Sequence, residues 1–296
     1  MRTRPPAGAI AGAVALAASL WMQTAGAQAT APEAPPTQPT EASRTPPALP
    51  LWELGVLGFG VSQQAYPGSS EQVVRGLPAP FFLYRGEILR ADRTGAGLRA
   101  IRTPELELDI GFAASFGSNS SDIEARRGMP DLGTLVEFGP RLKWQPRPGP
   151  IDEGVRLDLP LRGVFDLNDR LANRGVAFEP ALILERQVPG RWSWRASAGA
   201  LLGDARLAGH LYSVAPAFAT ADRPAYDARA GLIAWRLGAS FSRNLTADLR
   251  LFGFLRIDTA AGSTNASSPL VDRVTGASAG VGLAYTFMRS GRSAAD

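Results

Sequence analysis

The sequence has no cysteine and a single histidine, His210, and these shortages narrow its chemistry. Without cysteine there is no disulfide, no thiolate metal site and no cysteine nucleophile. A serine nucleophile usually needs a histidine base, and His210 has Ser213, Asp204 and Asp222 nearby in sequence. No known catalytic sequence motif surrounds these residues. We therefore interpret His210 as an exposed residue of a long loop at 204–229. We predict a non-enzymatic protein that holds neither metal nor cofactor.

Lysine is also nearly absent, because Lys143 is the only one. The net charge of +4 is therefore carried by arginine, against 27 acidic residues. Charges of both signs are scattered along the chain, which is unlike the clustered basic surface that nucleic acids require. We predict no nucleic-acid partner.

Long apolar runs are missing after the first residues. Residues 1–27 have the pattern of a secretory signal peptide: Arg2 and Arg4, an apolar stretch over 7–21, and a small-residue cleavage site at 25–27. A retained membrane anchor is the alternative. No later run approaches the roughly 18 apolar residues of a membrane helix. A membrane location would therefore require a β-barrel.

Residues 28–50 are rich in proline and poor in large apolar side chains. Such a composition cannot form a core and predicts an extended linker. This linker is either a spacer or a tether for a periplasmic partner.

Residues 51–287 alternate between apolar and small or polar side chains. From Glu105 to Phe116 every second residue is apolar, and the same holds from Ala277 to Phe287, which ends on an aromatic. A period of two over ten or more residues indicates strands, and this terminal pattern is typical of outer-membrane barrels. We predict an all-β fold, a transmembrane antiparallel up-and-down β-barrel of about twelve strands, with ten as the fallback, followed by a short tail at 288–296. The expected strands are 52–62, 78–85, 86–92, 95–102, 104–116, 134–146, 153–167, 175–187, 191–203, 230–243, 246–258 and 274–287.

Long and short connections alternate along these strands, with a short turn near 92–94 as the exception. Short turns belong to the periplasmic side and long loops to the outer side. Six aromatic residues then fall near the periplasmic interface, as a girdle requires: Trp52, Trp144, Trp192, Trp194, Phe241 and Phe287. A soluble β-barrel is the alternative, but strands of more than ten residues favour the membrane.

Charged residues occupy the other face of several strands and predict a polar lumen. The candidate lumen charges are Glu105, Glu107, Asp109, Glu137, Arg141, Arg156, Asp158 and Arg162. Paired carboxylates could serve acid–base catalysis, but acids and bases that neutralise one another explain the pattern better. Such charges would either plug the barrel or line a narrow channel.

Two loop motifs are candidate outer-surface sites. The first is Arg126, Arg127, Gly128, Met129, Pro130 and Asp131, and the second is Asp222, Arg223, Pro224 and Tyr226. The two arginines could contact lipopolysaccharide phosphates. Glycine, proline and aspartate would equally produce a fixed turn, and the second motif could cover the barrel mouth or simply return the chain to the next strand.

These segments resemble the MipA/OmpV family of outer-membrane proteins, the family of the MltA-interacting protein. The resemblance covers about 50–287 and rests on motifs at 52–55, 66–69, 77–80, 125–132, 137–140, 159–162, 178–180, 212–214, 222–226 and 268–271. It implies a barrel without enzymatic chemistry in the Gram-negative outer membrane, surrounded by lipid and lipopolysaccharide. It also implies a scaffold that joins a murein lytic transglycosylase to a bifunctional penicillin-binding protein. A small solute channel and a surface adhesin or stress-response protein remain the alternatives.

Overall fold

The alternating segments form the strands of one antiparallel sheet, described here from a computed structural model of residues 50–85, 89–92, 95–147, 154–188 and 192–294. These residues belong to a compact unit that spans Pro47–Asp296. The predicted signal peptide and nearly all of the predicted linker lie outside the described residues. None of the helices in the described residues has the length and apolar character needed to cross a membrane.

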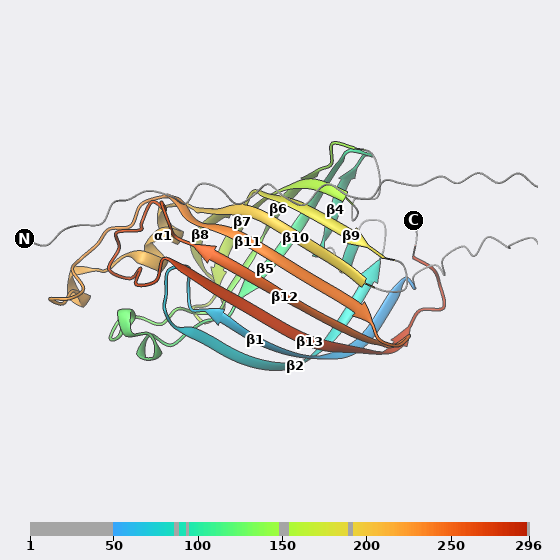
Figure 1. Ribbon diagram of the computed structural model, residues 1–296, viewed down its shortest axis with the longest axis horizontal. Helices are drawn as coiled ribbons and strands as arrows, with labels where there is room; N and C mark the ends of the chain where they lie inside the picture. Colours follow the sequence, from blue (N-terminus) through green and yellow to red (C-terminus); the bar gives the residue numbers. More distant parts are fainter. Residues whose placement is uncertain (1–49, 86–88, 93–94, 148–153, 189–191, 295–296) are drawn as a thin grey trace, which may run out of the picture. The chain divides into compact units, whose positions relative to one another are not determined.

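The described residues contain thirteen strand segments and a few short helices (Figure 1). The strands are β1 (Trp52–Gln64), β2 (Gln72–Arg85), β3 (Leu89–Asp92), β4 (Gly95–Arg102), β5 (Leu106–Ser115), β6 (Leu135–Trp144), β7 (Gly154–Asp166), β8 (Ala172–Phe178), β9 (Ala181–Gln187), β10 (Trp192–Gly203), β11 (Gly231–Asn244), β12 (Leu249–Thr259) and β13 (Thr275–Arg289). The helices are α1 (Ala205–Tyr212) and the single 3-10 turns η1 (Ser120–Asp122), η2 (Glu124–Arg126) and η3 (Pro216–Phe218).

The sheet closes on itself because β1 pairs with both β2 and β13. Segments β8 and β9 both lie between β7 and β10 and are one strand interrupted at Glu179 and Pro180. Pro180 has no N–H to donate to the ladder at this break. Thirteen segments, two of which share one position, give a barrel of twelve strands. The predicted fold class and strand number are confirmed.

Several strand boundaries differ from the prediction by two or more residues, and those of β2 and β13 involve pairing with β1. Strand β2 begins at Gln72 rather than near residue 78, because its first residues pair with the end of β1, where Gln64 faces Gln72. Strand β13 continues past Phe287, since Met288 and Arg289 still pair with β1. Part of the predicted tail is therefore strand, and Ser293 forms an isolated bridge with Pro50.

The two faces of the wall differ in polarity. Leu106, Leu161 and Leu255 are exposed on the outside, whereas their neighbours Glu107 and Asp258 are buried on the inside. Aromatic side chains gather on the outside near both ends of the strands. Trp192 packs against Phe241 at one end, and Phe112, Phe138 and Phe165 stack at the other. An apolar outer band between two aromatic belts is the surface that a membrane barrel needs.

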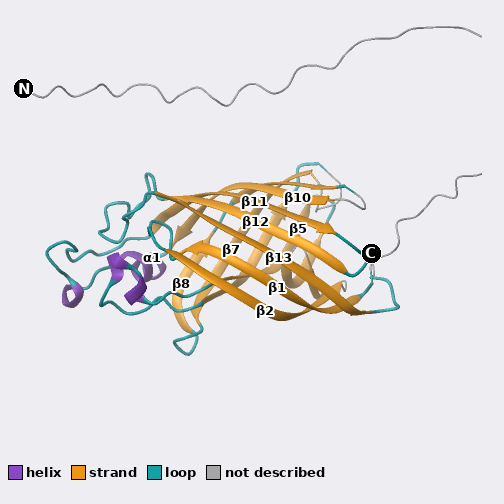
Figure 2. Cartoon of the chain, turned by 60° about the horizontal axis from the view of Figure 1, so that its bottom comes forward, coloured by secondary structure: helices purple, strands orange, loops and turns teal. Residues whose placement is uncertain are grey.

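The two ends of the barrel are built differently (Figure 2). One end carries α1, the 3-10 turns and the loops at 65–71, 116–134, 204–230 and 260–274, and we call it the capped end. The other end holds the short connections 103–105 and 245–248, the beginning of β1 and the end of β13, and we call it the turn end. The expected long loop at 204–229 contains α1, so that expectation needs correction. Asp204 caps this helix by accepting the N–H of Leu207 at 2.8 Å.

Candidate functional site

The loops at the capped end form a small hydrophobic core of their own. Helix α1 contributes Leu207, Leu211 and Tyr212, and the other loops contribute Ile123 and Leu270, all of them buried. These side chains pack on the buried residues at the end of the barrel wall. Burial of large apolar side chains stabilises each by about 1.5–3 kcal/mol, so the loops form a fixed cap rather than separate flexible connections.

Hydrogen bonds between loops distant in sequence hold this cap together. The hydroxyl of Tyr66 donates to the carbonyl of Leu270 at 2.8 Å, and the hydroxyl of Tyr212 donates to that of Pro67 at 2.7 Å. The Ser268 hydroxyl donates to the Tyr212 carbonyl at 2.7 Å. Burial raises the pKa of Tyr66 and Tyr212 above the ordinary range, so both hydroxyls remain donors. These hydrogen bonds thus join three of the four main loops at the capped end, namely 65–71, 204–230 and 260–274.

The first candidate outer-loop motif lies in this cap, but its two arginines differ. Arg126 is buried, and its guanidinium donates to the carbonyls of Leu211 and Pro130, both at 3.2 Å. Burial lowers the pKa of Arg126, and the nearby charge of Arg223 adds to the effect. Arg127 is exposed. Only Arg127 is therefore accessible to a large external anion.

The rest of the first motif forms a fixed turn. Gly128 has φ +82°, the left-handed region that favours glycine. Met129 packs against the cap core and Pro130 is exposed. The Asp131 carboxylate accepts the N–H of Ser120 at 2.6 Å. The motif therefore acts as a structural turn on which Arg127 is displayed.

The second motif is joined to the first. The Arg223 guanidinium donates to the carbonyls of Ala125 and Arg127, both at 3.0 Å. The Tyr226 hydroxyl donates to Asn265 Oδ1 at 3.3 Å, while Asp222 and Pro224 are exposed. Sequence reasoning placed the two motifs separately, and the structure brings them together in one cap.

His210 lies on α1 with its Nε2 atom buried and without a hydrogen-bond partner. Burial lowers its pKa to about 4, and the positive charges of Arg174 and Arg126 add to this effect. Its sequence neighbours have other partners, since Asp204 caps α1 and the Ser213 hydroxyl accepts the N–H of Ala228 at 3.0 Å. This is the environment of a neutral histidine packed in the cap.

Inside the barrel, the charged side chains of β5 and β6 form a compact cluster. Lys143 donates to Glu107 at 2.7 Å and lies 2.9 Å from Asp109, which also pairs with Arg141 at 2.5 Å. Lys143 and Glu107 are only 2 % and 4 % exposed. Isolated charges at such positions would be very costly, so the pairing itself allows them to lie there. Glu105 precedes β5 and is exposed, outside this cluster.

A second chain of charges crosses the lumen toward β11 and β12. Arg162 pairs with Glu137 at 2.9 Å and with Glu179, which also pairs with Arg236. Arg236 in turn pairs with Asp258 at 2.7 Å. Glu179 therefore connects β7 to β11 at the interruption between β8 and β9.

A third group involves β7, β9 and β10. Arg156 pairs with Asp158 at 2.8 Å and with Glu185 at 2.9 Å, and Arg195 pairs with Glu185 at 2.9 Å. The candidate lumen charges include Arg156 and Asp158 but not the other charged residues that line the same interior: Glu179, Glu185, Arg195, Arg236, Arg256 and Asp258. All of these except Glu179, which lies at the break between β8 and β9, occupy inward positions of alternating strands, so their signal was present in the sequence.

The described part of the lumen also has an apolar side, which encloses a cavity of about 370 Å³. Inward side chains of β1, β2 and β12 form most of its apolar lining: Leu57, Phe81, Leu83, Phe252 and Phe254. Trp194, Phe241 and Ala284 also line it. Serines of β10 and β11, together with Arg195, Arg250 and Glu185, complete it. The barrel interior is therefore charged along one arc and apolar along another.

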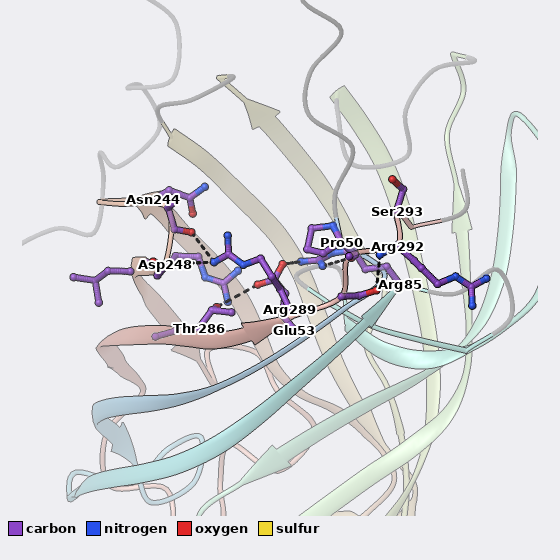
Figure 3. A pocket seen from close by; sticks show the side chains of 15 residues that line it. Pro50, Glu53, Arg85, Asn244, Asp248, Thr286, Arg289, Arg292 and Ser293 are labelled. Carbon is purple, nitrogen blue, oxygen red and sulfur yellow. Dashed lines mark hydrogen bonds and ion pairs between the residues drawn. The ribbon is translucent and has the colours of Figure 1, made fainter.

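A second cavity, of about 410 Å³, opens at the turn end (Figure 3). Arg85 pairs with Glu53 at 2.7 Å and also donates to the carbonyl of Pro50 at 2.8 Å. Arg289 pairs with Asp248 across the same space, and the exposed Arg292 lies at its edge. With Arg250, the lining holds four guanidinium groups against two carboxylates. This cavity favours an anionic or acidic partner.

Two solved structures have a distant likeness to this chain. The NanC porin shares 10% identity at a TM-score of 0.36, over 78% of this chain and 98% of the porin. A Pseudomonas aeruginosa FadL homologue shares 9% identity at a TM-score of 0.32, over 83% of this chain and 73% of the homologue. Both likenesses are distant, and no curated protein matches in sequence. The profile of the MltA-interacting protein MipA family matches residues 55–287. Because this match runs from β1 into β13, the chain belongs to the MltA-interacting protein MipA family.

Proposed function

We propose that this protein is an outer-membrane scaffold that docks murein-remodelling enzymes on its turn end. The observation that carries the proposal is the family membership, because the family is described by its interaction with MltA. The partners would be a lytic transglycosylase and, as the family resemblance implies, a bifunctional penicillin-binding protein. The protein would serve as a membrane platform without chemistry of its own.

The difference between the two ends supports the turn end as the docking surface. Short turns of such barrels face the periplasm, where murein lies. Each end has a cavity, but their charges differ. The cavity of about 410 Å³ at the turn end has two more arginines than carboxylates, whereas the cavity of about 500 Å³ at the capped end has one more carboxylate than arginines. A positive cavity favours encounter with an acidic partner surface. The beginning of β1 lies at this end, so the residues that precede it could take part in docking.

Co-purification of the transglycosylase from detergent-solubilised envelopes tests this proposal. Arg292→Glu reverses the charge of an exposed side chain at the edge of the turn-end cavity, and we expect it to reduce recovery of the enzyme about tenfold. Arg127→Glu is the matched control, because it makes the same change on an exposed side chain at the capped end. Deletion of residues 30–48 shows whether the proline-rich segment contributes to binding of the transglycosylase.

Unchanged recovery with Arg292→Glu and with the deletion would contradict the scaffold assignment. Reduced recovery with Arg127→Glu alone would show that the orientation is inverted. Heat-modifiable migration on gels confirms that each variant has inserted as a barrel.

A small solute channel is the second candidate, and the cavity of about 370 Å³ within the lumen favours it. Single-channel conductance in planar bilayers distinguishes the two functions, because a scaffold needs no ion pathway. A third role, surface adhesion or lipopolysaccharide contact, would use the exposed Arg127 at the capped end. Loss of lipopolysaccharide binding on Arg127→Gln would support that role.

A further inference from the structure

The apolar arc of the lumen is an unusual surface for the interior of a membrane barrel. Lumen-facing residues of such barrels are ordinarily polar. Here Leu57 and Phe81 come from adjacent strands, and Phe252 and Phe254 extend the surface onto β12. Phe59 stacks on both of the last two rings, with centroid separations of 5.8 and 6.2 Å. Covering apolar surface that would otherwise contact water is favourable by about 25 cal/mol per Å².

Glycines on neighbouring strands keep these rings flat against the wall. A Cβ atom at Gly280 would come within 2.6 Å of Phe254 and 2.7 Å of Phe59, and one at Gly282 within 2.6 Å of Phe252. Larger residues at these inward positions would push the rings toward the barrel axis. The glycines therefore preserve an open cavity with aromatic walls instead of a filled core.

The next two strands of the wall, β11 and β10, are polar where they line the cavity. Ser240 and Ser242 of β11 pair directly with Phe254 and Phe252 of β12, and Ser193 of β10 pairs with Ser242. Arg195 and Arg250 line the same space, with Glu185 as the one carboxylate among the lining residues. That carboxylate also accepts hydrogen bonds from Arg156, which further neutralises it. The lining thus holds two guanidinium groups and one carboxylate beside an apolar wall.

We propose that this cavity binds a monoanionic amphiphile, a carboxylate with an unbranched hydrocarbon chain of about ten to fourteen carbons. The chain would cover the apolar arc, and the carboxylate would lie between Arg195 and Arg250. The volume of about 370 Å³ lies within the usual range for small-molecule sites. Charge complementarity selects an anion over a neutral or cationic chain of the same length. This proposal does not rest on the scaffold role.

Photo-crosslinking to the full-length protein in lipid nanodiscs tests the proposal. The probe is dodecanoate with a diazirine near the chain end, and mass spectrometry of peptides locates the label. We expect label on the lumen-facing residues of β1, β2 and β12, and at least fivefold less with dodecanol or dodecyltrimethylammonium probes of the same design. Equal labelling by all three probes would refute the anionic specificity.

Two variants separate cavity binding from partition into the bilayer. Ser240→Trp fills the cavity from its polar wall and should reduce lumen labelling about tenfold. Leu255→Trp is the control, because this neighbouring side chain faces outward. Arg195→Gln should remove the preference for the carboxylate, whereas Arg186→Gln, at an exposed outward position on β9, should not. Label confined to outward positions, or unchanged by Ser240→Trp in a protein that still shows heat-modifiable migration, would overturn the proposal.

Discussion

Removal of the Glu179 charge should destabilise the barrel more than removal of any exposed acid. Glu179 joins Arg162 on one side to Arg236 on the other. In Glu179→Gln the side chain keeps its size and can still accept hydrogen bonds, but it no longer neutralises the two guanidinium groups. A hydrogen bond to a charged group contributes about 1.5–3 kcal/mol, so two such bonds set an upper limit of roughly 6 kcal/mol.

The expected loss is smaller because each arginine keeps another partner. Arg162 retains Glu137 at 2.9 Å, and Arg236 retains Asp258 at 2.7 Å. We therefore expect Glu179→Gln to lower the free energy of unfolding by about 2–4 kcal/mol. Asp248→Asn is the matched control, since Asp248 pairs with Arg289 at an exposed position where both side chains are more than 40 % accessible. Exposed pairs contribute less than about 1 kcal/mol.

Reversible unfolding in guanidinium chloride, followed by tryptophan fluorescence in lipid vesicles, measures both changes. A double-mutant cycle with Arg162→Gln isolates the coupling between Arg162 and Glu179. If Glu179→Gln costs no more than Asp248→Asn, or if the cycle gives no coupling, the chain of charges does not stabilise the barrel and the reasoning is refuted.

Three further predictions address the wall and the cap. Leu108→Arg places a charge on the lipid-facing side of β5 and should cost about 2–4 kcal/mol in vesicle unfolding, whereas Ser240→Arg on the lumen side should cost much less. Burial lowers the pKa of His210 to about 4, so the folded protein binds fewer protons than the unfolded chain and loses stability as the pH falls from about 6.5 to about 4. The loss reaches up to about 3 kcal/mol, and His210→Gln should remove this part of the pH dependence without altering behaviour above pH 7. Leu270→Ala opens a void in the cap and should cost about 2–5 kcal/mol, detectable as faster proteolysis of the capped-end loops while the strands remain protected.

The strands could be predicted from sequence because a wall with two different faces imposes a period of two on every segment. The glutamates and aspartates of β5 and β7 alternate with leucine and therefore indicate which face is inward. In β12 the pattern is ambiguous, since Phe252 and Phe254 occupy the inward positions beside Leu251 and Leu255 on the outward face. Because both faces of β12 carry apolar residues, the alternation does not reveal the aromatic arc of the lumen.

Features that depend on closure of the barrel could not be predicted in the same way. Glu179 and Arg236 are 57 residues apart and meet only because the sheet curves around the lumen. The cap was missed for a related reason, because its core unites short apolar groups from four separate loops. Helix α1 did leave a local signal, with Asp204 as a capping residue followed by Leu207 and Leu211 on one face.

The two cavities adjoin at Arg250, which lines both the lumen cavity and the turn-end cavity. An amphiphile whose carboxylate approaches Arg250 from inside would change the charge that a docked partner meets from outside. By thermodynamic linkage, an effect of the amphiphile on partner affinity requires an equal effect of the partner on amphiphile affinity. Arg250→Gln should therefore weaken both interactions, whereas Arg195→Gln should alter only carboxylate binding and Arg292→Glu only co-purification of the enzyme. If Arg250→Gln alters just one of them, the two sites act separately.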